Sequence, residues 1–155
     1  NIDTILSRAK QLIRQKDNVK GLVIDPWNKL EASRAKGQSE TEYVAEVLNK
    51  LTYFAKVYGI HVWLIAHPKK MERAQDGSYT VPRPWDISGS SHFFNQADIC
   101  WTIFRHVHDP GADVEFHVQK VRDAGVDGEL GVVRLKFNRD TGVYSEGEQR
   151  FEEMM

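Results

Sequence analysis

The chain has 155 residues, of which 41% are hydrophobic and 28% charged, and its formal net charge is -1 at pH 7. This composition predicts a folded globular domain and excludes collagen-like, coiled-coil and fully disordered proteins. No stretch approaches the roughly 18 consecutive apolar residues of a membrane helix, and the N-terminus lacks a signal-peptide core, so we expect a cytoplasmic protein with no membrane partner. The lone Cys100 can form neither an internal disulfide nor a cysteine metal cluster. Because overall charge does not favour nucleic acid, such binding would need a local patch or a ring of subunits.

The first half of the chain alternates between helical and strand patterns. A charged amphipathic helix is predicted near the N-terminus, where apolar residues recur at helical spacing. The apolar runs 21–25 and 60–66 are typical of strands buried on both faces. Between them, Ser39 and Glu42 form a capping-box pattern that begins a long helix, and Gly59 stands where a left-handed residue ends one. Helix, strand, helix, strand predicts an α/β sheet of parallel strands.

The second half is expected to be mostly β-structure. Residues 146–155 are acidic and are expected to form a disordered tail after a structured portion at 1–145. Residues 68–90, between the two halves, show neither helical nor strand periodicity and are expected to form a long loop. Loops of that length are usually functional or disordered. The expected segments are loops at 26–38 and 68–90, a short helix at 91–97, strands at 99–104, 114–121 and 130–137, a turn at 138–142 and a last short strand near 143–144.

Each of the two predicted parallel strands ends in an ionisable residue. Asp25 closes the first strand and His67 follows the second. In open α/β sheets ligands bind outside the carboxyl ends of the strands, so Asp25 and His67 are predicted to be neighbours over one crevice. An aspartate at the end of an apolar strand suits the Walker B position, which holds Mg²⁺ beside a nucleotide. The alternatives are that Asp25 only ends a buried strand and that His67 is an ordinary histidine at the edge of a sheet.

Cations gather in two other places. Lys69, Lys70, Arg73 and Arg83 lie in the long loop and could follow a phosphate backbone, although nearby acidic residues offset much of their charge. Lys120 and Arg122 share one face at the end of the predicted strand 114–121 and suit a phosphate or carboxylate partner. An internal ion pair explains the second pair equally well.

A nucleotide site of the ordinary P-loop kind cannot be completed by this sequence. Such a loop ends in a Lys-Ser or Lys-Thr pair, and no lysine in the chain is followed by Ser or Thr. The chain begins with Asn1, already inside a helical pattern, rather than with methionine. We therefore expect a fragment of a longer protein, with the P-loop, if there is one, upstream.

Taken in order, several stretches resemble the hexameric replicative helicases of the DnaB type, most closely the phage helicase-primase and Twinkle branch. The resemblance covers about residues 20 to 145. Each motif is loose, but the order and spacing together are fairly specific. The matching stretches are 21–25, 62–70, 87–91 leading to 96–98, 119–122, 127–131 and 137–142.

The resemblance implies an α/β fold, the C-terminal portion of a RecA-like P-loop NTPase core that lacks the P-loop strand and helix. This core would have a mainly parallel sheet flanked by helices, with a β-hairpin part at the C-terminus. ATP and Mg²⁺ are the implied cofactors. By the resemblance, Asp25 is the Walker B carboxylate that holds Mg²⁺ with the nucleotide, and His67 is the sensor of the γ-phosphate. Arg122, with Lys120 beside it, is the finger that reaches the ATP of the next subunit.

The resemblance also implies partners and an activity. The parent would be an ATP-dependent helicase that encircles single-stranded DNA as a ring, usually a hexamer, and unwinds duplex 5′ to 3′ in a bacterial or phage-infected cell, while this fragment alone would be inactive. The alternatives are a RecA-like recombination or repair ATPase and a non-catalytic α/β module that binds nucleic acid or protein. The implied DNA-binding residues are Lys69, Lys70, Arg73, Arg83, Ser88, Gly89, Ser90 and His92.

Overall fold

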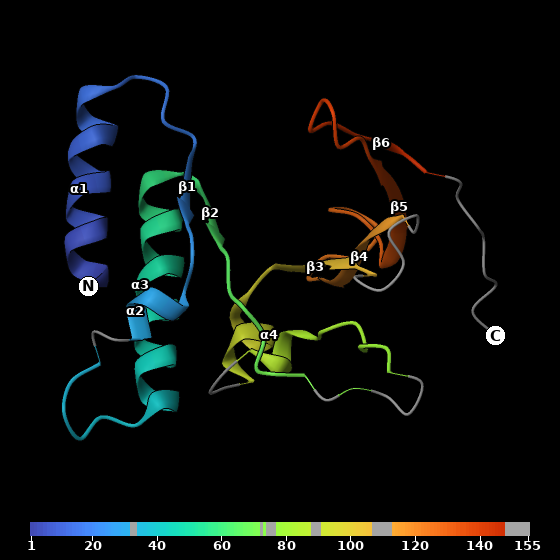
Figure 1. Cartoon of the computed structure of the whole chain (residues 1–155). Helices are drawn as coiled ribbons and strands as arrows, with labels where there is room; N and C mark the ends of the chain where they lie inside the picture. Colours follow the sequence, from blue (N-terminus) through green and yellow to red (C-terminus); the bar gives the residue numbers. More distant parts are fainter. Residues whose placement is uncertain (32–33, 72, 74–76, 88–90, 107–112, 148–155) are drawn as a thin grey trace. The chain divides into compact units, whose positions relative to one another are not determined.

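The computed structural model describes residues 1–31, 34–71, 73, 77–87, 91–106 and 113–147. The chain divides into two compact units, and each is described by itself (Figure 1). Unit 1 consists of Asn1–Lys69 and Ile87–Gln96, and unit 2 of Lys70–Asp86 and Ala97–Met155. The predicted boundary between a structured portion at 1–145 and a tail stays a prediction, because most of 146–155 lies outside the described residues.

Unit 1 follows the predicted order of helices and strands. Strands β1 and β2 pair in parallel, with Gly21 opposite His61 and Ile24 opposite Leu64, which confirms the parallel pairing expected from the sequence. Figure 1 shows the two strands side by side, with α3 running along them. The elements are α1 (Ile2–Gln15), β1 (Gly21–Ile24), α2 (Asn28–Glu31), α3 (Glu40–Tyr58), β2 (His61–Leu64) and α4 (His92–Gln96).

Local side-chain chemistry sets the ends of α3, as the sequence predicted. The hydroxyl of Ser39 accepts a hydrogen bond from the backbone N–H of Glu42, and the Glu42 carboxylate accepts one from the backbone N–H of Ser39. The pKa of Glu42 is lowered because its carboxylate accepts hydrogen bonds from the Ser39 hydroxyl, at 2.7 Å, and from the Ser39 backbone N–H, which favour the ionised form. Gly59 ends the helix at φ 59°, a left-handed conformation that favours glycine.

One face of the β1–β2 sheet packs on the core, and the other does not. Leu22, Ile24, Val62 and Leu64 point to the core that α1 and α3 complete. Val23, on the opposite face, is 59% exposed. The prediction that these strands are buried on both faces is therefore wrong for this chain. On the exposed face the ring of Trp63 lies so close to Gly21 that a Cβ there would overlap it.

Unit 2 is built on a four-stranded antiparallel sheet in the order β3-β4-β5-β6. A β-bulge interrupts the pairing of β3 with β4 between Cys100 and Trp101. The prediction of a mainly parallel sheet is wrong, because only β1 and β2 are parallel among the described strands. The elements of unit 2 are a 3-10 helix η1 (Pro84–Asp86) and strands β3 (Ile99–Arg105), β4 (Val114–Val121), β5 (Gly131–Phe137) and β6 (Tyr144–Glu146).

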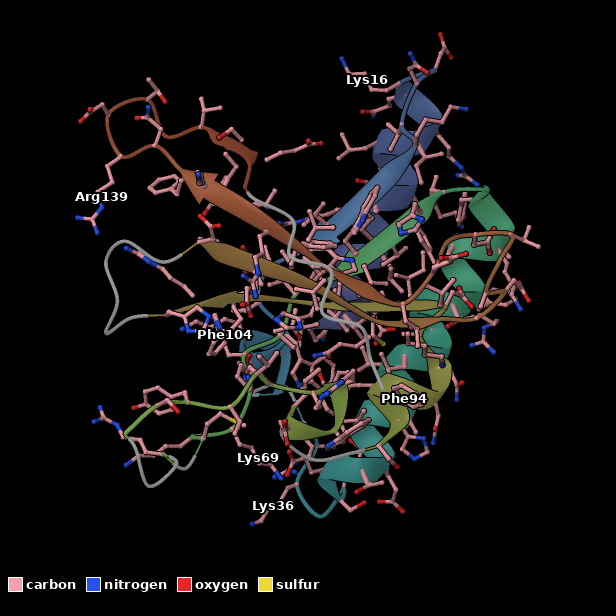
Figure 2. All side chains as sticks on the ribbon, turned by 90° about the vertical axis from the view of Figure 1, so that its right-hand side faces the viewer. Lys16, Lys36, Lys69, Phe94, Phe104 and Arg139 are labelled. Atoms are coloured by element: carbon pink, nitrogen blue, oxygen red, sulfur yellow. The ribbon has the colours of Figure 1, made fainter. Side chains whose placement is uncertain are left out.

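Both predicted loops contain short helices that the sequence pattern did not indicate. Helix α2 lies within 26–38, where Trp27 and Leu30 are buried, and η1 lies within 68–90. Arg139, labelled in Figure 2, lies in the turn that joins β5 to β6, which was predicted at 138–142. No helix among the described residues is long and apolar enough to cross a membrane.

Candidate functional site

Asp25 and His67 follow neighbouring strands of unit 1, as predicted. Because β1 and β2 are parallel and in register, both strands end at the same edge of the sheet. Asp25 comes directly after β1, and His67 lies three residues after β2. Both residues are exposed. In the described part of the chain the Asp25 carboxylate has no hydrogen-bond or ion-pair partner, which leaves it available to a ligand.

Three hydrogen bonds continue the contact between the two chain segments beyond the strands. The backbone N–H of Ile65 donates to the carbonyl of Ile24 at 2.9 Å, and the backbone N–H of Trp27 donates to the carbonyl of Ile65 at 2.7 Å. The third is made by a side chain: Oδ1 of Asn28 accepts from the backbone N–H of His67 at 3.0 Å. These bonds hold the segment after Asp25 alongside the segment that ends in His67.

Trp27 anchors the segment that follows Asp25. Its side chain is fully buried, at 0% exposure. The ring meets Phe93 of α4 edge-on at 5.3 Å between centroids, and it meets Tyr43 of α3 at 5.8 Å. The hydroxyl of Tyr43 donates to the carbonyl of Leu30 at 2.7 Å, which fixes the end of α2 on α3. The position of Asp25 therefore rests on aromatic packing that involves three helices.

The predicted DNA-binding residues are divided between the two units. Lys69, which is exposed and labelled in Figure 2, follows β2 in unit 1. His92 is half-buried at the start of α4, also in unit 1. Lys70, Arg73 and Arg83 belong to unit 2. The residues Ser88, Gly89 and Ser90 lie outside the described residues.

Arg73 is held by an aromatic side chain. Its Nε donates to the hydroxyl of Tyr79 at 3.0 Å, and its guanidinium carbon lies 5.0 Å from the centre of the Tyr79 ring. An isolated antiparallel bridge joins the same two residues. A guanidinium over an aromatic face remains a cation, so the pair keeps a positive charge and a π-surface together. Lys70 and Arg83 are exposed.

Arg122 forms the internal ion pair that the sequence left open. Its Nε lies 2.6 Å from Oδ1 of Asp98, and its Nη2 donates to the carbonyl of Ala97 at 3.3 Å. The arginine and aspartate side chains are 46% and 78% exposed, so the pair is on the surface of unit 2. Lys120 lies in β4 opposite Cys100. Burial raises the pKa of the Cys100 thiol, and the charge of Lys120 opposes that rise.

Unit 2 contains a polar cluster around Glu115 that was not predicted from the sequence. The Glu115 carboxylate contacts Nε2 of His117 at 2.8 Å, Nε2 of His106 at 3.3 Å and Nη2 of Arg134 at 4.0 Å. Burial alone would raise the pKa of Glu115, but the contacts with His117 and His106 together lower it. The sequence signal for this cluster was the spacing of Glu115 and His117, which are two residues apart in a strand and therefore lie on the same face. No group of three or more potential ligands that could hold a metal ion occurs among the residues the structure describes.

Comparison with known structures defines the class of fold. The chain is similar to a DnaB-like replicative helicase, solved in a study of its interactions with primase, with a TM-score of 0.71 and 21% identity. The match covers 96% of this chain and 36% of that one. This similarity, with the parallel β1–β2 pair, shows an α/β fold of the same kind as the matching part of that structure.

Sequence comparison then gives the family. No family model matches the chain. The chain is 38% identical over 149 residues to the Twinkle homolog protein, chloroplastic/mitochondrial, of Arabidopsis thaliana. The match covers 94% of this chain but 20% of the plant protein, so the chain spans about a fifth of that relative. The sequence and structure comparisons together support a fragment of a DnaB-type replicative helicase.

Proposed function

We propose that this chain is the C-terminal part of the motor domain of an ATP-dependent DNA helicase. The observation that carries the proposal is the placement of Asp25 and His67 at adjacent ends of two parallel strands, in a chain related to the DnaB-type helicases. Parallel strand ends are where α/β proteins bind ligands. The parent protein would translocate on single-stranded DNA as a ring and unwind duplex 5′ to 3′.

Asp25 is the residue that would hold Mg²⁺ with the nucleotide. Mg²⁺ in nucleotide sites is typically bound by one or two carboxylates together with phosphate oxygens and water. The exposed Asp25 carboxylate, without a partner among the described side chains, fits that role. When bound, Mg²⁺ neutralises charge on the phosphates. The chain itself has no lysine followed by Ser or Thr, so we expect the isolated chain not to hydrolyse ATP.

His67 is proposed as the sensor of the γ-phosphate. Its backbone is tied to the segment after Asp25, and an antiparallel bridge joins the next residue, Pro68, to Ile87. Residues 88–90, which we propose contact DNA, follow Ile87 directly. A shift of His67 on loss of the phosphate would reach Ile87 through this bridge.

Arg122 is proposed to act on the nucleotide of a neighbouring subunit, with Lys120 beside it. A cation supplied from another subunit stabilises charge on the transferred phosphoryl group and makes hydrolysis depend on assembly. The surface ion pair with Asp98 is compatible with this role, since exposed pairs contribute little free energy and exchange partners at small cost. Lys69, Lys70, Arg73, Arg83, Ser88, Gly89, Ser90 and His92 would contact single-stranded DNA, and Tyr79 or Trp85 would offer stacking surfaces.

Unwinding of a forked duplex tests the proposal. The full-length parent, with ATP and Mg²⁺, is expected to unwind a fork that carries a free 5′ tail and to lose this activity with Asp25→Asn. Strand exchange without unwinding would indicate a recombination or repair ATPase. DNA or protein binding without any nucleotide dependence would indicate a non-catalytic module, and either result would overturn the proposal.

A mixed-subunit experiment tests Arg122. If Arg122 acts between subunits, Arg122→Ala chains should still bind ATP but should lower unwinding by more than their share when mixed with wild type. Arg139→Ala is the matched control, because Arg139 is an exposed arginine of the β5–β6 turn. Mixtures whose activity falls only in proportion to the variant would contradict the role of Arg122.

A further inference from the structure

Asn28 makes the side-chain contact that joins the two halves of the candidate site. Of the three hydrogen bonds that extend the β1–β2 pairing, those of Ile65 and Trp27 use backbone atoms alone and can form with almost any side chains. The bond to His67 requires an acceptor at position 28, which Oδ1 of Asn28 supplies at 3.0 Å. Identity of the side chain therefore matters at this contact.

Asn28 connects the buried core of unit 1 to the backbone of His67. Asn28 is the first residue of α2, and it follows Trp27, which is fully buried between Tyr43 and Phe93. Asn28 is half-buried, while the hydrogen bond that it accepts from His67 lies at the exposed surface. A residue fixed to the core on one side and bonded to the backbone of His67 on the other can transmit a displacement between them.

We infer that Asn28 is a positioning residue that couples Asp25 to His67. This inference rests on the proposed function, in which Asp25 holds Mg²⁺ with the nucleotide and His67 senses the γ-phosphate. Asn28 holds the His67 backbone at a fixed position relative to Asp25. Movement of His67 is passed along the chain through Pro68, which is bridged to Ile87, to Lys69, which we propose contacts DNA. Without the Asn28 side chain the backbone bonds of Ile65 and Trp27 remain, but the His67 backbone loses its hydrogen bond to the segment that follows Asp25.

The first test measures the contact itself and does not depend on hydrolysis. In the full chain, the exchange of the His67 backbone amide with solvent is followed by NMR in wild type and in three variants. Asn28→Ala should speed exchange by about fivefold, the effect of losing one hydrogen bond of ordinary net strength. Asn28→Asp keeps the acceptor oxygen and should leave exchange slow. Lys29→Ala, the control on the same helix, is exposed and should leave exchange unchanged.

The second test measures coupling in the full-length parent. The readout is the ratio of ATP turnover with single-stranded DNA to turnover without it, which cancels effects on basal catalysis. Asn28→Ala should lower this ratio by about fivefold, because it lowers DNA-stimulated turnover more than basal turnover. Asn28→Asp should restore the ratio, a rescue that a merely space-filling role would not produce.

The outcomes separate the inference from the proposed function. Unchanged amide exchange in Asn28→Ala, or an unchanged DNA-stimulation ratio despite faster exchange, overturns the role of Asn28 and leaves the helicase proposal standing. Equal losses in basal and stimulated turnover also overturn it, because they indicate a general structural role. A wild-type parent that hydrolyses no ATP overturns the proposed function and the inference together.

Discussion

Replacement of Trp27 by alanine probes the packing that positions Asp25. The Trp27 side chain is 0% exposed and contacts the rings of Tyr43 and Phe93. Truncation of a buried tryptophan to alanine costs about 3–5 kcal/mol, because transfer free energy is lost and a cavity remains. One term opposes this cost: Nε1 of Trp27 is buried without a hydrogen-bond partner among the described residues, and its removal relieves a penalty of about 1–3 kcal/mol. We therefore expect Trp27→Ala to destabilise unit 1 by about 2 kcal/mol, the difference between the central values of these two terms.

Urea unfolding followed by the helical circular dichroism signal measures this effect. The signal reports unit 1, because all four α-helices in the described part of the chain belong to it. Trp27→Phe, which removes the unpaired N–H but keeps an aromatic ring, should cost less than half as much. Trp85→Ala is the control, since Trp85 is 55% exposed in unit 2 and its loss should leave the helical transition in place. A free energy of unfolding for Trp27→Ala within about 0.5 kcal/mol of the wild-type value would refute the packing argument.

Three further predictions concern the Arg122–Asp98 ion pair, the Glu115 cluster and the N-terminal cap of α3. Arg122→Ala should change the free energy of unfolding by less than about 1 kcal/mol, because its pair with Asp98 is exposed; a larger loss in urea titration would show that the pair is structural. Glu115 has a lowered pKa in the folded state, so its contribution to stability is present above the unfolded pKa near 4.5 and is lost as pH falls below it. Thermal melting across this range should show a smaller acid-induced drop for Glu115→Gln, while the exposed Glu129→Gln should melt as wild type; equal drops in all three proteins would refute the assignment. Ser39→Ala should lower the stability of unit 1 by about 1 kcal/mol and Ser39→Asp should restore it; equal stability of both variants would contradict the cap.

The sequence predicted the features that depend on nearby residues. The capping box of Ser39 and Glu42 and the left-handed end at Gly59 are confirmed, because each needs only residues within one helical turn. The order of elements and the neighbouring ends at Asp25 and His67 are also confirmed, since parallel pairing follows from the crossover through α3.

Features that depend on distant partners were not predictable. Asp98 and Arg122 are 24 residues apart, and no sequence pattern indicates that β3 and β4 bring them together. Helix α2 is too short for a periodic signal, and it is held by the burial of Trp27 and Leu30. The apolar strand β1 predicted burial on both faces, yet Val23 is 59% exposed, because hydrophobicity shows that a face can be covered and not which element covers it.

ATP hydrolysis by the full-length parent, with and without single-stranded DNA, tests the central claim most directly. The claim is that Asp25 and His67 belong to a DNA-dependent motor. We predict turnover that rises when DNA is added and that is lost with Asp25→Asn, while Asp25→Asn protein stays folded by circular dichroism. Hydrolysis that is unchanged by DNA and by Asp25→Asn, or no hydrolysis by a well-folded wild type, would contradict the claim and leave Asp25 as the structural end of a strand.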